Sequence, residues 1–243
     1  MKLKNKVCLI TGSSRGIGKA IAKAFAKEGG HVIITYRSDR KVAIKTAAEI
    51  GLTDIYKLDV SKKFSVQNTF KKVKKKYGKI DVLVNNAGVN RTNDFDKLSE
   101  RDWDYVMDIN LKGVFFCCQE VLKYMPNKGK IINIGSLSGE YGGPRTPSYA
   151  AAKAGVMSLT HCLARFVGKR NINVNCISPG IISGEFTKAS MAKSVRKLID
   201  SLLLIQRSGK HEDLVGAAIF LATKDSEYMT GQTISINGGA WVR

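Results

Sequence analysis

Seven short apolar runs alternate with longer stretches of helical periodicity along this 243-residue chain, and this alternation limits the folds that the chain can adopt. The runs are continuous rather than alternating with polar residues, as expected for strands that helices cover on both faces of a sheet. Strands that alternate with helices in this way form a parallel sheet. The sequence therefore predicts one doubly wound α/β domain over residues 1–243, with a parallel sheet of about seven strands.

The predicted elements follow one another without a linker that would divide the chain. The predicted strands are Lys6–Thr11, His31–Tyr36, Asp54–Asp59, Ile80–Asn85, Lys130–Gly135, Asn173–Ile177 and Gln232–Ile236. The predicted helices, after one that begins near Ile17, are Lys41–Ile50, Ser65–Tyr77, Glu100–Met125, Tyr149–Gly168, Lys188–Leu204 and Glu212–Ala222. In such sheets ligands bind beyond the carboxyl ends of the strands, so residues that follow strands are the candidates for function.

The charge of the chain is strongly unbalanced. Forty lysine and arginine residues against twenty aspartate and glutamate residues give a formal net charge of +20, which attracts anions such as nucleic acids, phosphorylated cofactors and acidic proteins. The densest group of lysines, between Phe70 and Lys79, lies on a predicted amphipathic helix. It is interpreted as a solvated face, because no nucleic-acid-binding motif accompanies it, and no nucleic-acid partner is expected.

The cysteines and histidines form no metal-binding pattern. Five cysteines show no CxxC spacing and three histidines lie far apart, so we expect no metal site and buried thiols in a reducing compartment. No apolar run approaches the roughly 18 residues of a membrane span. The apolar run after the charged N-terminus, Val7–Ile10, is too short for a signal peptide. The chain is therefore expected in the cytoplasm, with no membrane partner.

A glycine-rich turn follows the first predicted strand and opens the first helix. It reads Thr11-Gly12-Ser13-Ser14-Arg15-Gly16-Ile17-Gly18, and we call it the glycine turn. Glycines let the backbone approach a diphosphate closely, while the helix N-terminus presents free N–H groups and the positive end of its dipole. Between a strand and a helix, this turn predicts a Rossmann-like dinucleotide site whose candidate residues are Gly12, Ser13, Ser14, Arg15, Gly16, Ile17 and Gly18.

The end of the second predicted strand bears on which dinucleotide binds. An acidic residue there would accept a hydrogen bond from the 2′-hydroxyl of NAD. Arg37 stands there instead, and together with Arg15 it provides cations that pair with a 2′-phosphate. This pattern favours NADP(H), while the nearby Asp39 keeps NAD open as the alternative.

Tyr149 and Lys153 stand four residues apart at the start of a predicted helix and therefore share one face of it. A free tyrosine has a pKa of about 10, and an ammonium nearby, with the positive nicotinamide of an oxidised cofactor, would stabilise its phenolate. Lowering that pKa by two or three requires only about 3–4 kcal/mol. Tyr149 would then protonate a carbonyl oxygen as hydride arrives, and Ser136, which follows a strand, would donate to the developing alkoxide.

Taken together, these motifs resemble those of the short-chain dehydrogenase/reductase family. The matching motifs, in order and spacing over nearly the whole chain, are the glycine turn, Asn85-Asn86-Ala87-Gly88, Asn110, Ser136, Tyr149-Ala150-Ala151-Ala152-Lys153 and Pro179-Gly180. Within the family, Arg15, the start of the helix at Tyr149 and the tail Thr230-Gly231-Gln232…Asn237-Gly238-Gly239 are most similar to 3-oxoacyl-[acyl-carrier-protein] reductases. The resemblance implies NADPH-dependent reduction of a 3-oxoacyl thioester in fatty acid biosynthesis, with Tyr149 as the general acid.

The resemblance also implies roles for residues that chemistry alone does not single out. Asn110 would bend its helix and hold a water near Lys153, which completes a proton relay. Besides the glycine turn, Arg37, Tyr149 and Lys153, the implied cofactor contacts are Asp59, Val60, Asn86, Ala87, Gly88, Pro179, Gly180 and Ile182. One position departs from the family pattern, because Gly184 stands where a threonine that holds the nicotinamide carboxamide is common.

The segment from about residue 181 to residue 205 lies where a substrate-covering lid is expected. It combines apolar residues suited to an acyl chain with basic residues suited to an acidic partner, although an ordinary amphipathic helix fits it equally well. The resemblance implies a homotetramer and an acidic acyl carrier protein that docks on Lys169 and Arg170. Lys128 adjoins the second expected docking position, where Asn127 replaces a basic residue.

Two other functions stay open from the sequence. The same chemistry would serve another ketone or secondary alcohol, such as a sugar, a steroid or a small ketone. The chain would otherwise be a non-catalytic basic Rossmann protein that binds nucleic acid, and the presence of Ser136, Tyr149 and Lys153 argues against that.

Overall fold

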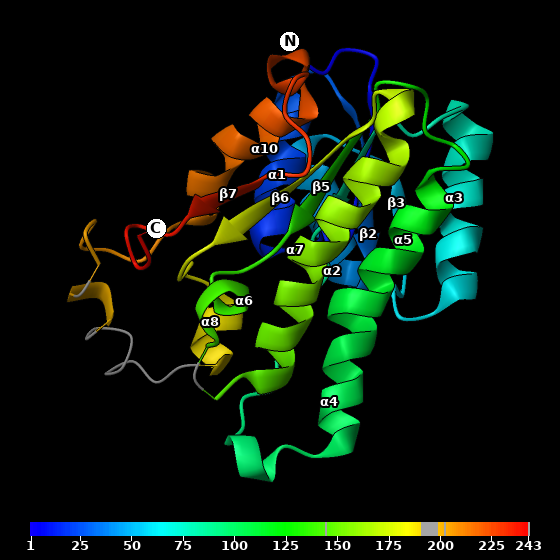
Figure 1. Ribbon diagram of the computed structural model, residues 1–243. Coiled ribbons are helices and arrows are strands. Elements are labelled where there is room, and N and C mark those ends of the chain that lie inside the picture. Colours follow the sequence, from blue (N-terminus) through cyan, green and yellow to red (C-terminus); the bar gives the residue numbers. More distant parts are fainter. Residues whose placement is uncertain (144, 191–198, 202, 243) are drawn as a thin grey trace.

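The computed structural model describes residues 1–143, 145–190, 199–201 and 203–242 (Figure 1). Seven parallel strands form one sheet in the order β3-β2-β1-β4-β5-β6-β7, which confirms the predicted doubly wound α/β fold. The strands are β1 (Val7–Ile10), β2 (His31–Tyr36), β3 (Ile55–Lys57), β4 (Val82–Asn85), β5 (Lys130–Ile134), β6 (Asn173–Pro179) and β7 (Thr233–Ile236). Chain order reverses beside β1, whose two neighbours are β2 and β4, so the ligand crevice is expected there.

Helices cover both faces of the sheet, as the continuous apolar strands require. One face is covered by α3 (Lys63–Tyr77), α5 (Gly113–Val121) and α7 (Pro147–Val167), whose buried Phe70, Val114 and Val156 share one core cluster. The other face is covered by α1 (Gly16–Lys27), α2 (Arg40–Ile50) and α10 (Val215–Ala222).

The long helix predicted over Glu100–Met125 is interrupted. It forms α4 (Glu100–Met107), a π-helical turn η2 (Asp108–Lys112) and α5, which ends at Val121. Two short elements were not predicted, the 3₁₀ turn η1 (Phe95–Lys97) and α6 (Ser138–Tyr141). The chain then passes through the 3₁₀ turn η3 (Gly168–Arg170) after α7 and through η5 (Lys224–Ser226) before β7.

The predicted helix over Lys188–Leu204 corresponds in part to α8 (Glu185–Ser190). Residues 191–198 and 202, which include Met191, Lys193, Val195, Arg196, Lys197 and Leu198 of the expected lid, lie outside the described residues. After this segment the chain enters the 3₁₀ turn η4 (His211–Leu214), which leads directly into α10.

The described part of the chain holds neither a membrane-spanning helix nor a cluster of metal-ligating side chains. None of its helices combines the length and the apolar character needed to cross a membrane. Within the same residues, no group of histidine, cysteine and acidic side chains is placed to hold a metal ion. All five cysteines are free, and four of them are buried as predicted, whereas the prediction is wrong for Cys162, which is exposed on α7.

Candidate active site

The glycine turn is held in place by hydroxyl groups on neighbouring strands. Thr35 on β2 accepts a 2.9 Å hydrogen bond from the Gly12 N–H and donates one of 2.9 Å to the Ile10 carbonyl. The Ser13 hydroxyl is fully buried and donates to the same carbonyl while it accepts from the Thr35 N–H. The side chain of Ser13 is therefore structural, and Thr35 is a supporting residue that the sequence analysis missed.

Asparagine and threonine side chains join the glycine turn to the loop after β4. The Asn86 amide donates to the carbonyls of Thr11 and Gly12 at 2.9 and 3.1 Å. The Thr11 hydroxyl accepts from the N–H groups of Asn86 and Ala87. A Cβ on Gly18 would lie 2.5 Å from the Asn86 amide nitrogen, so this junction requires a glycine.

The glycine turn fits a dinucleotide diphosphate on two structural grounds. Gly12 and Gly16 have φ angles of +64° and +59°, which glycine adopts without strain, and a Cβ on Gly12 would lie 3.0 Å from Ala87 Cα. The side chain of Arg15, the N-cap residue of α1, makes no capping hydrogen bond, so the first N–H groups of the helix are available to an anion. Ile17 is partly buried and packs against the core below the turn. The Ser14 carbonyl accepts a hydrogen bond from Thr46.

The two candidate arginines for the 2′-phosphate are exposed, and each has a polar contact on another element. Arg37 follows β2 and donates a 3.0 Å hydrogen bond to the Tyr105 hydroxyl on α4. Arg15 forms a 3.3 Å ion pair with Glu185 at the start of α8. Both arginines sit at the carboxyl edge of the sheet, on the side of β1 where the adenine half of a dinucleotide is expected.

Asp59 and Val60 follow β3, which ends at Lys57, two residues earlier than the predicted strand Asp54–Asp59. One carboxylate oxygen of Asp59 accepts hydrogen bonds from the Ser61 N–H and hydroxyl, which leaves its second oxygen without a contact among the described residues. Val60 is buried, and a Cβ on Gly113 would lie 2.7 Å from its Cγ2. These two residues therefore border the crevice from the β3 side and pack against the first turn of α5.

Three of the four expected catalytic side chains converge at the carboxyl edge of β5. Ser136 lies just past β5, and Tyr149 and Lys153 lie in the first turns of α7. The Lys153 ammonium donates a 2.6 Å hydrogen bond to the Ile134 carbonyl, and its nitrogen lies 5.6 Å from the centre of the Tyr149 ring. Figure 1 shows these first turns of α7, together with α6 and α8, at the arrowhead end of the strands. On α8, Phe186 lies with its ring centre 5.8 Å from that of Tyr149.

The electrostatics of the pair differ from the sequence-based expectation. Burial raises the pKa of Tyr149, and its hydrogen bond to Ser136 lowers that pKa by less. Burial also lowers the pKa of Lys153 to about 8, which weakens the lysine as a partner for phenolate. The acidification that Lys153 was expected to cause is therefore not a property of the chain alone. Tyr149 is protonated at neutral pH, which is the state that reduction of a ketone requires.

Asn110 is fully buried in the π-helical turn, and its side chain hydrogen-bonds the backbone of the loop after β4. Its amide oxygen accepts a 2.8 Å hydrogen bond from the Val89 N–H, and its amide nitrogen donates one of 2.7 Å to the Val89 carbonyl. A Cβ on Gly88 would lie 3.0 Å from that amide oxygen, so a glycine at position 88 leaves room for the hydrogen bonds between Asn110 and Val89. Asn110 therefore lies where the helix changes to π-helical geometry. Its role in holding a water near Lys153 stays a prediction.

Pro179 is the last residue of β6, and Gly180 and Ile182 lie in the loop that follows it and borders the site. A Cβ on Gly180 would lie 2.6 Å from Asn237 Cα, so this glycine allows the C-terminal tail to approach. Ile182 is buried and pairs with Gly209 in an isolated β-bridge. Where the family pattern has a threonine at position 184, the nearest threonine is Thr187 on α8, whose hydroxyl donates to the Ile182 carbonyl.

The expected docking residues Lys128, Lys169 and Arg170 lie at the opposite edge of the sheet. Lys169 and Arg170 follow α7, roughly 27 Å along that helix from Tyr149 at 1.5 Å per residue. The Arg170 guanidinium donates to the carbonyls of Leu122 and Met125 and to Asn127, so it braces the end of α5. Lys128 and Lys169 are exposed, and Lys128 forms a 3.5 Å ion pair with the exposed Glu227.

A buried amide network that the sequence analysis missed ties β4, β5 and α7 together beneath the site. The Asn85 amide donates a 2.9 Å hydrogen bond to Asn133, which donates one of 2.9 Å to the Thr160 hydroxyl. Asn85 was noted only as part of a motif, and Asn133 lies within an apolar run that gives no local signal.

Comparisons with known proteins agree with this geometry. A family model described as enoyl-(acyl carrier protein) reductase matches residues 12–240. The 3-oxoacyl-[acyl-carrier-protein] reductase FabG of Thermotoga maritima is 42% identical over 98% of this chain and 99% of its own length. The protein of the same description from Staphylococcus epidermidis is 38% identical over 98% of this chain and 100% of its own.

Solved structures show the same architecture over the whole chain. A short-chain dehydrogenase/reductase from Serratia marcescens is 32% identical, with a TM-score of 0.93 over 99% of each chain. A blue fluorescent protein from a metagenomic library, solved in complex with NADPH, is 31% identical, with a TM-score of 0.93 over 100% of each chain.

Proposed function

This chain belongs to the short-chain dehydrogenase/reductase family, and from that premise we propose that it reduces 3-oxoacyl thioesters to 3-hydroxyacyl thioesters with NADPH. The observation that carries the proposal is the convergence of Ser136, Tyr149 and Lys153 beside the glycine turn. The relatives described as 3-oxoacyl-[acyl-carrier-protein] reductases, at 37–42% identity over nearly their full length, support this substrate class.

The chain's own residues account for the proton half of the reaction. NADPH supplies the hydride that adds to the ketone carbon. Tyr149, protonated at neutral pH, donates its proton to the ketone oxygen, and Ser136 stabilises that oxygen by donating a hydrogen bond to it. The Lys153 ammonium, held by the Ile134 carbonyl, then stabilises the phenolate.

The cofactor is NADP(H), and the chain holds it with the glycine turn, Arg37, Asp59, Val60, the loop Asn86–Gly88 and the loop from Pro179 to Ile182. Exposed arginines at the adenine side favour the 2′-phosphate over a free 2′-hydroxyl. The preference is measured by the dissociation constants of NADPH and NADH, and equal values would contradict it.

Reduction of acetoacetyl thioester, followed as loss of NADPH absorbance, tests the substrate class against a panel of ketones. The panel contains a ketosugar, a ketosteroid and small ketones, so that it covers the second candidate function. We expect kcat/KM to be at least tenfold higher for the thioester. If a panel ketone reacts faster than the thioester, that ketone class is the substrate instead. If neither the thioester nor any panel ketone is turned over, the chain is not a reductase.

The acyl group arrives on an acyl carrier protein, for which the chain's +20 charge is electrostatically suited. Phe186 beside Tyr149 supplies apolar surface for an acyl chain. The exposed side chains of Lys128 and Lys169 dock the carrier protein, and reversing their charge tests this role. Replacing both with glutamate is expected to raise KM for the carrier-bound substrate and to leave KM for a small acetoacetyl thioester unchanged.

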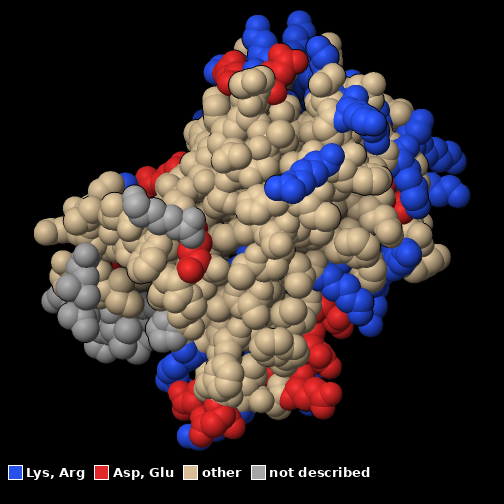
Figure 2. All heavy atoms as spheres, in the orientation of Figure 1, with Lys and Arg blue, Asp and Glu red and all other residues tan. Residues whose placement is uncertain are grey.

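The enzyme assembles as a homotetramer in the cytoplasm. Figure 2 shows the face over α5 and α7 with few charged side chains, and Phe115 and Phe166 are 44% and 77% exposed on these helices. Exposed apolar surface of this kind is typical of subunit interfaces. Light scattering of wild type and of Phe166→Asp measures the assembly, and a monomeric wild type would contradict it. The five free cysteines suit a reducing compartment.

A further inference from the structure

His211 lies against the glycine turn although it is remote from that turn in sequence. Its ring nitrogen Nε2 is 3.8 Å from the point where Gly16, the first residue of α1, would carry a Cβ. The same nitrogen is 2.9 Å from the corresponding point on Gly184, in the loop after β6. The imidazole therefore occupies the space between the N-terminus of α1 and the loop that borders the nicotinamide side of the site.

This space exists because neither neighbour has a side chain. A threonine at position 184 would bring its Cβ within 2.9 Å of Nε2, so the imidazole would have to move. Gly184, which departs from the family pattern, and His211 therefore form a matched pair in this chain. Neither ring nitrogen of His211 hydrogen-bonds a group in the parts of the chain that the structure describes, and the side chain is only partly buried.

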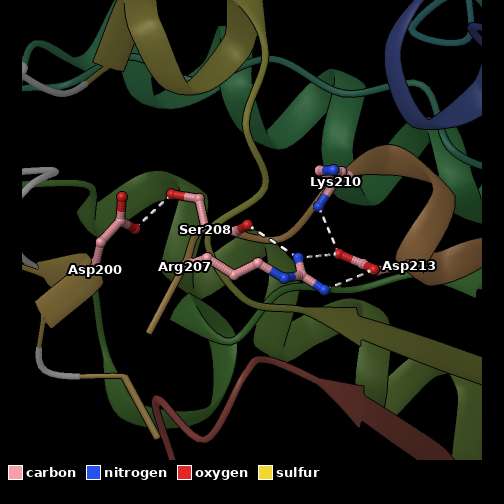
Figure 3. Close-up of polar contacts among 5 residues, drawn as sticks. All are labelled: Asp200, Arg207, Ser208, Lys210 and Asp213. Carbon is pink, nitrogen blue, oxygen red and sulfur yellow. Dashed lines mark hydrogen bonds and ion pairs between the residues drawn. The ribbon is translucent and has the colours of Figure 1, made fainter. Parts of the chain in front are cut away.

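The backbone that carries His211 is firmly placed. Figure 3 shows Asp213, in the same 3₁₀ turn, held by the Arg207 guanidinium on two nitrogens, at 2.7 and 3.1 Å. Asp213 also accepts a 2.7 Å hydrogen bond from the Lys210 N–H, which caps the turn. His211 is therefore presented by a braced turn, and less ordering is needed when it binds a ligand.

We propose that His211 is a cofactor-binding residue that donates a hydrogen bond from Nε2 to the diphosphate of NADP(H). A neutral imidazole has one N–H to donate, so the contact does not depend on a charged histidine. The uncapped N–H groups of α1 lie beside it and act on the same anion. The other nearby charges, Arg15 and Glu185, pair with each other. The inference rests on the proposed function, because it assigns a residue to the same cofactor.

Binding of three ligands to His211→Ala separates the diphosphate from the rest of the cofactor. The ligands are NADP⁺, 2′-phospho-ADP-ribose, which lacks nicotinamide, and adenosine 2′-monophosphate, which lacks the diphosphate. Dissociation constants from calorimetry need no turnover. We expect the first two ligands to bind about tenfold more weakly to the variant, and the third to change by less than about twofold. His211→Gln, which keeps a donor, is expected to recover most of the loss.

His161→Ala, at an exposed position on α7, is the matched control and is expected to bind all three ligands like wild type. Equal losses for all three ligands in His211→Ala would mean that the imidazole only supports the fold. Weaker binding of NADP⁺ alone would assign the contact to nicotinamide, and unchanged dissociation constants for all three ligands would show that His211 makes no contact with them. Each of these results overturns the proposal. Failure of wild type to bind NADP⁺ would instead refute the proposed function and this inference together.

The pairing with Gly184 gives a second, independent test. Gly184→Thr should weaken NADP⁺ binding in wild type because it displaces the imidazole. In the His211→Ala background the same substitution should have little further effect, since nothing is left to displace. Additive effects of the two substitutions would show that they act separately.

Discussion

The Lys153 ammonium donates a 2.6 Å hydrogen bond to the carbonyl of Ile134, the last residue of β5. The contact fixes the lysine relative to the sheet rather than to the tyrosine four residues earlier on its own helix. The cation is therefore held at the carboxyl edge of the sheet, 5.6 Å from the centre of the Tyr149 ring.

This buried cation predicts a pH dependence of stability. Burial lowers the pKa of Lys153 to about 8 in the folded chain, whereas an unfolded lysine has a pKa of about 10.4. Between these values the unfolded chain binds a proton that the folded chain has released, so this residue's contribution to the free energy of unfolding rises with pH. Relative to Lys153→Met, wild type should gain about 2 kcal/mol between pH 7 and pH 9.5.

Urea unfolding of both proteins at several pH values measures this difference, and titration of all other groups cancels in the comparison. A constant difference between wild type and Lys153→Met would show that the ammonium is not buried as described.

Tyr149→Phe should lower kcat for thioester reduction by at least about 10²-fold, because the phenylalanine has no proton to donate. Its dissociation constant for NADP⁺ should stay within about twofold of wild type, since the ring and its packing against Phe186 are kept. Tyr141→Phe on α6 is the control and should retain activity, because that ring stacks on Trp241, with ring centres 6.1 Å apart, and is kept in the variant. Retained turnover in Tyr149→Phe would refute the assigned general acid.

Much of this site follows from local sequence. The glycine turn, Ser136 and the Tyr149–Lys153 spacing each lie next to a strand or at a helix start, where short-range patterns are informative. The strand boundaries match the prediction within three residues for the same reason. Composition and order along the chain were enough to place these groups at one edge of the sheet.

Other features depend on contacts between distant segments and gave no local signal. The π-helical turn forms where the Asn110 side chain bonds the Val89 backbone, 21 residues earlier. Arg170 was interpreted as a docking residue, but its guanidinium folds back onto carbonyls near the end of α5. His211 reaches the glycine turn only because the chain returns past β6 before α10. Local patterns in a single sequence do not predict these contacts between distant segments.

Asn110→Leu should destabilise the chain and lower activity together. The substitution leaves the Val89 N–H and carbonyl without their side-chain partners, at a cost of about 2–4 kcal/mol for the two bonds in a buried setting. Because Val89 follows the loop that borders the cofactor, the NADP⁺ dissociation constant should also rise. Urea unfolding and calorimetry measure both effects. An unchanged free energy of unfolding would show that the amide does not hold this loop.

Gly180→Ala tests how closely the C-terminal tail approaches the loop after β6. The added methyl group would lie 2.6 Å from Asn237 Cα. Because that atom belongs to the backbone, the C-terminal tail around Asn237 would have to shift to make room. The expected cost in free energy of unfolding is about 1–3 kcal/mol, with weaker NADP⁺ binding because the loop borders the nicotinamide side. Gly216→Ala on α10 is the matched control: nothing lies within 4 Å of its added methyl, so it should stabilise the helix by up to about 1 kcal/mol. If both substitutions shift the unfolding midpoint in the same direction, the tail does not pack against Gly180 as the structure shows.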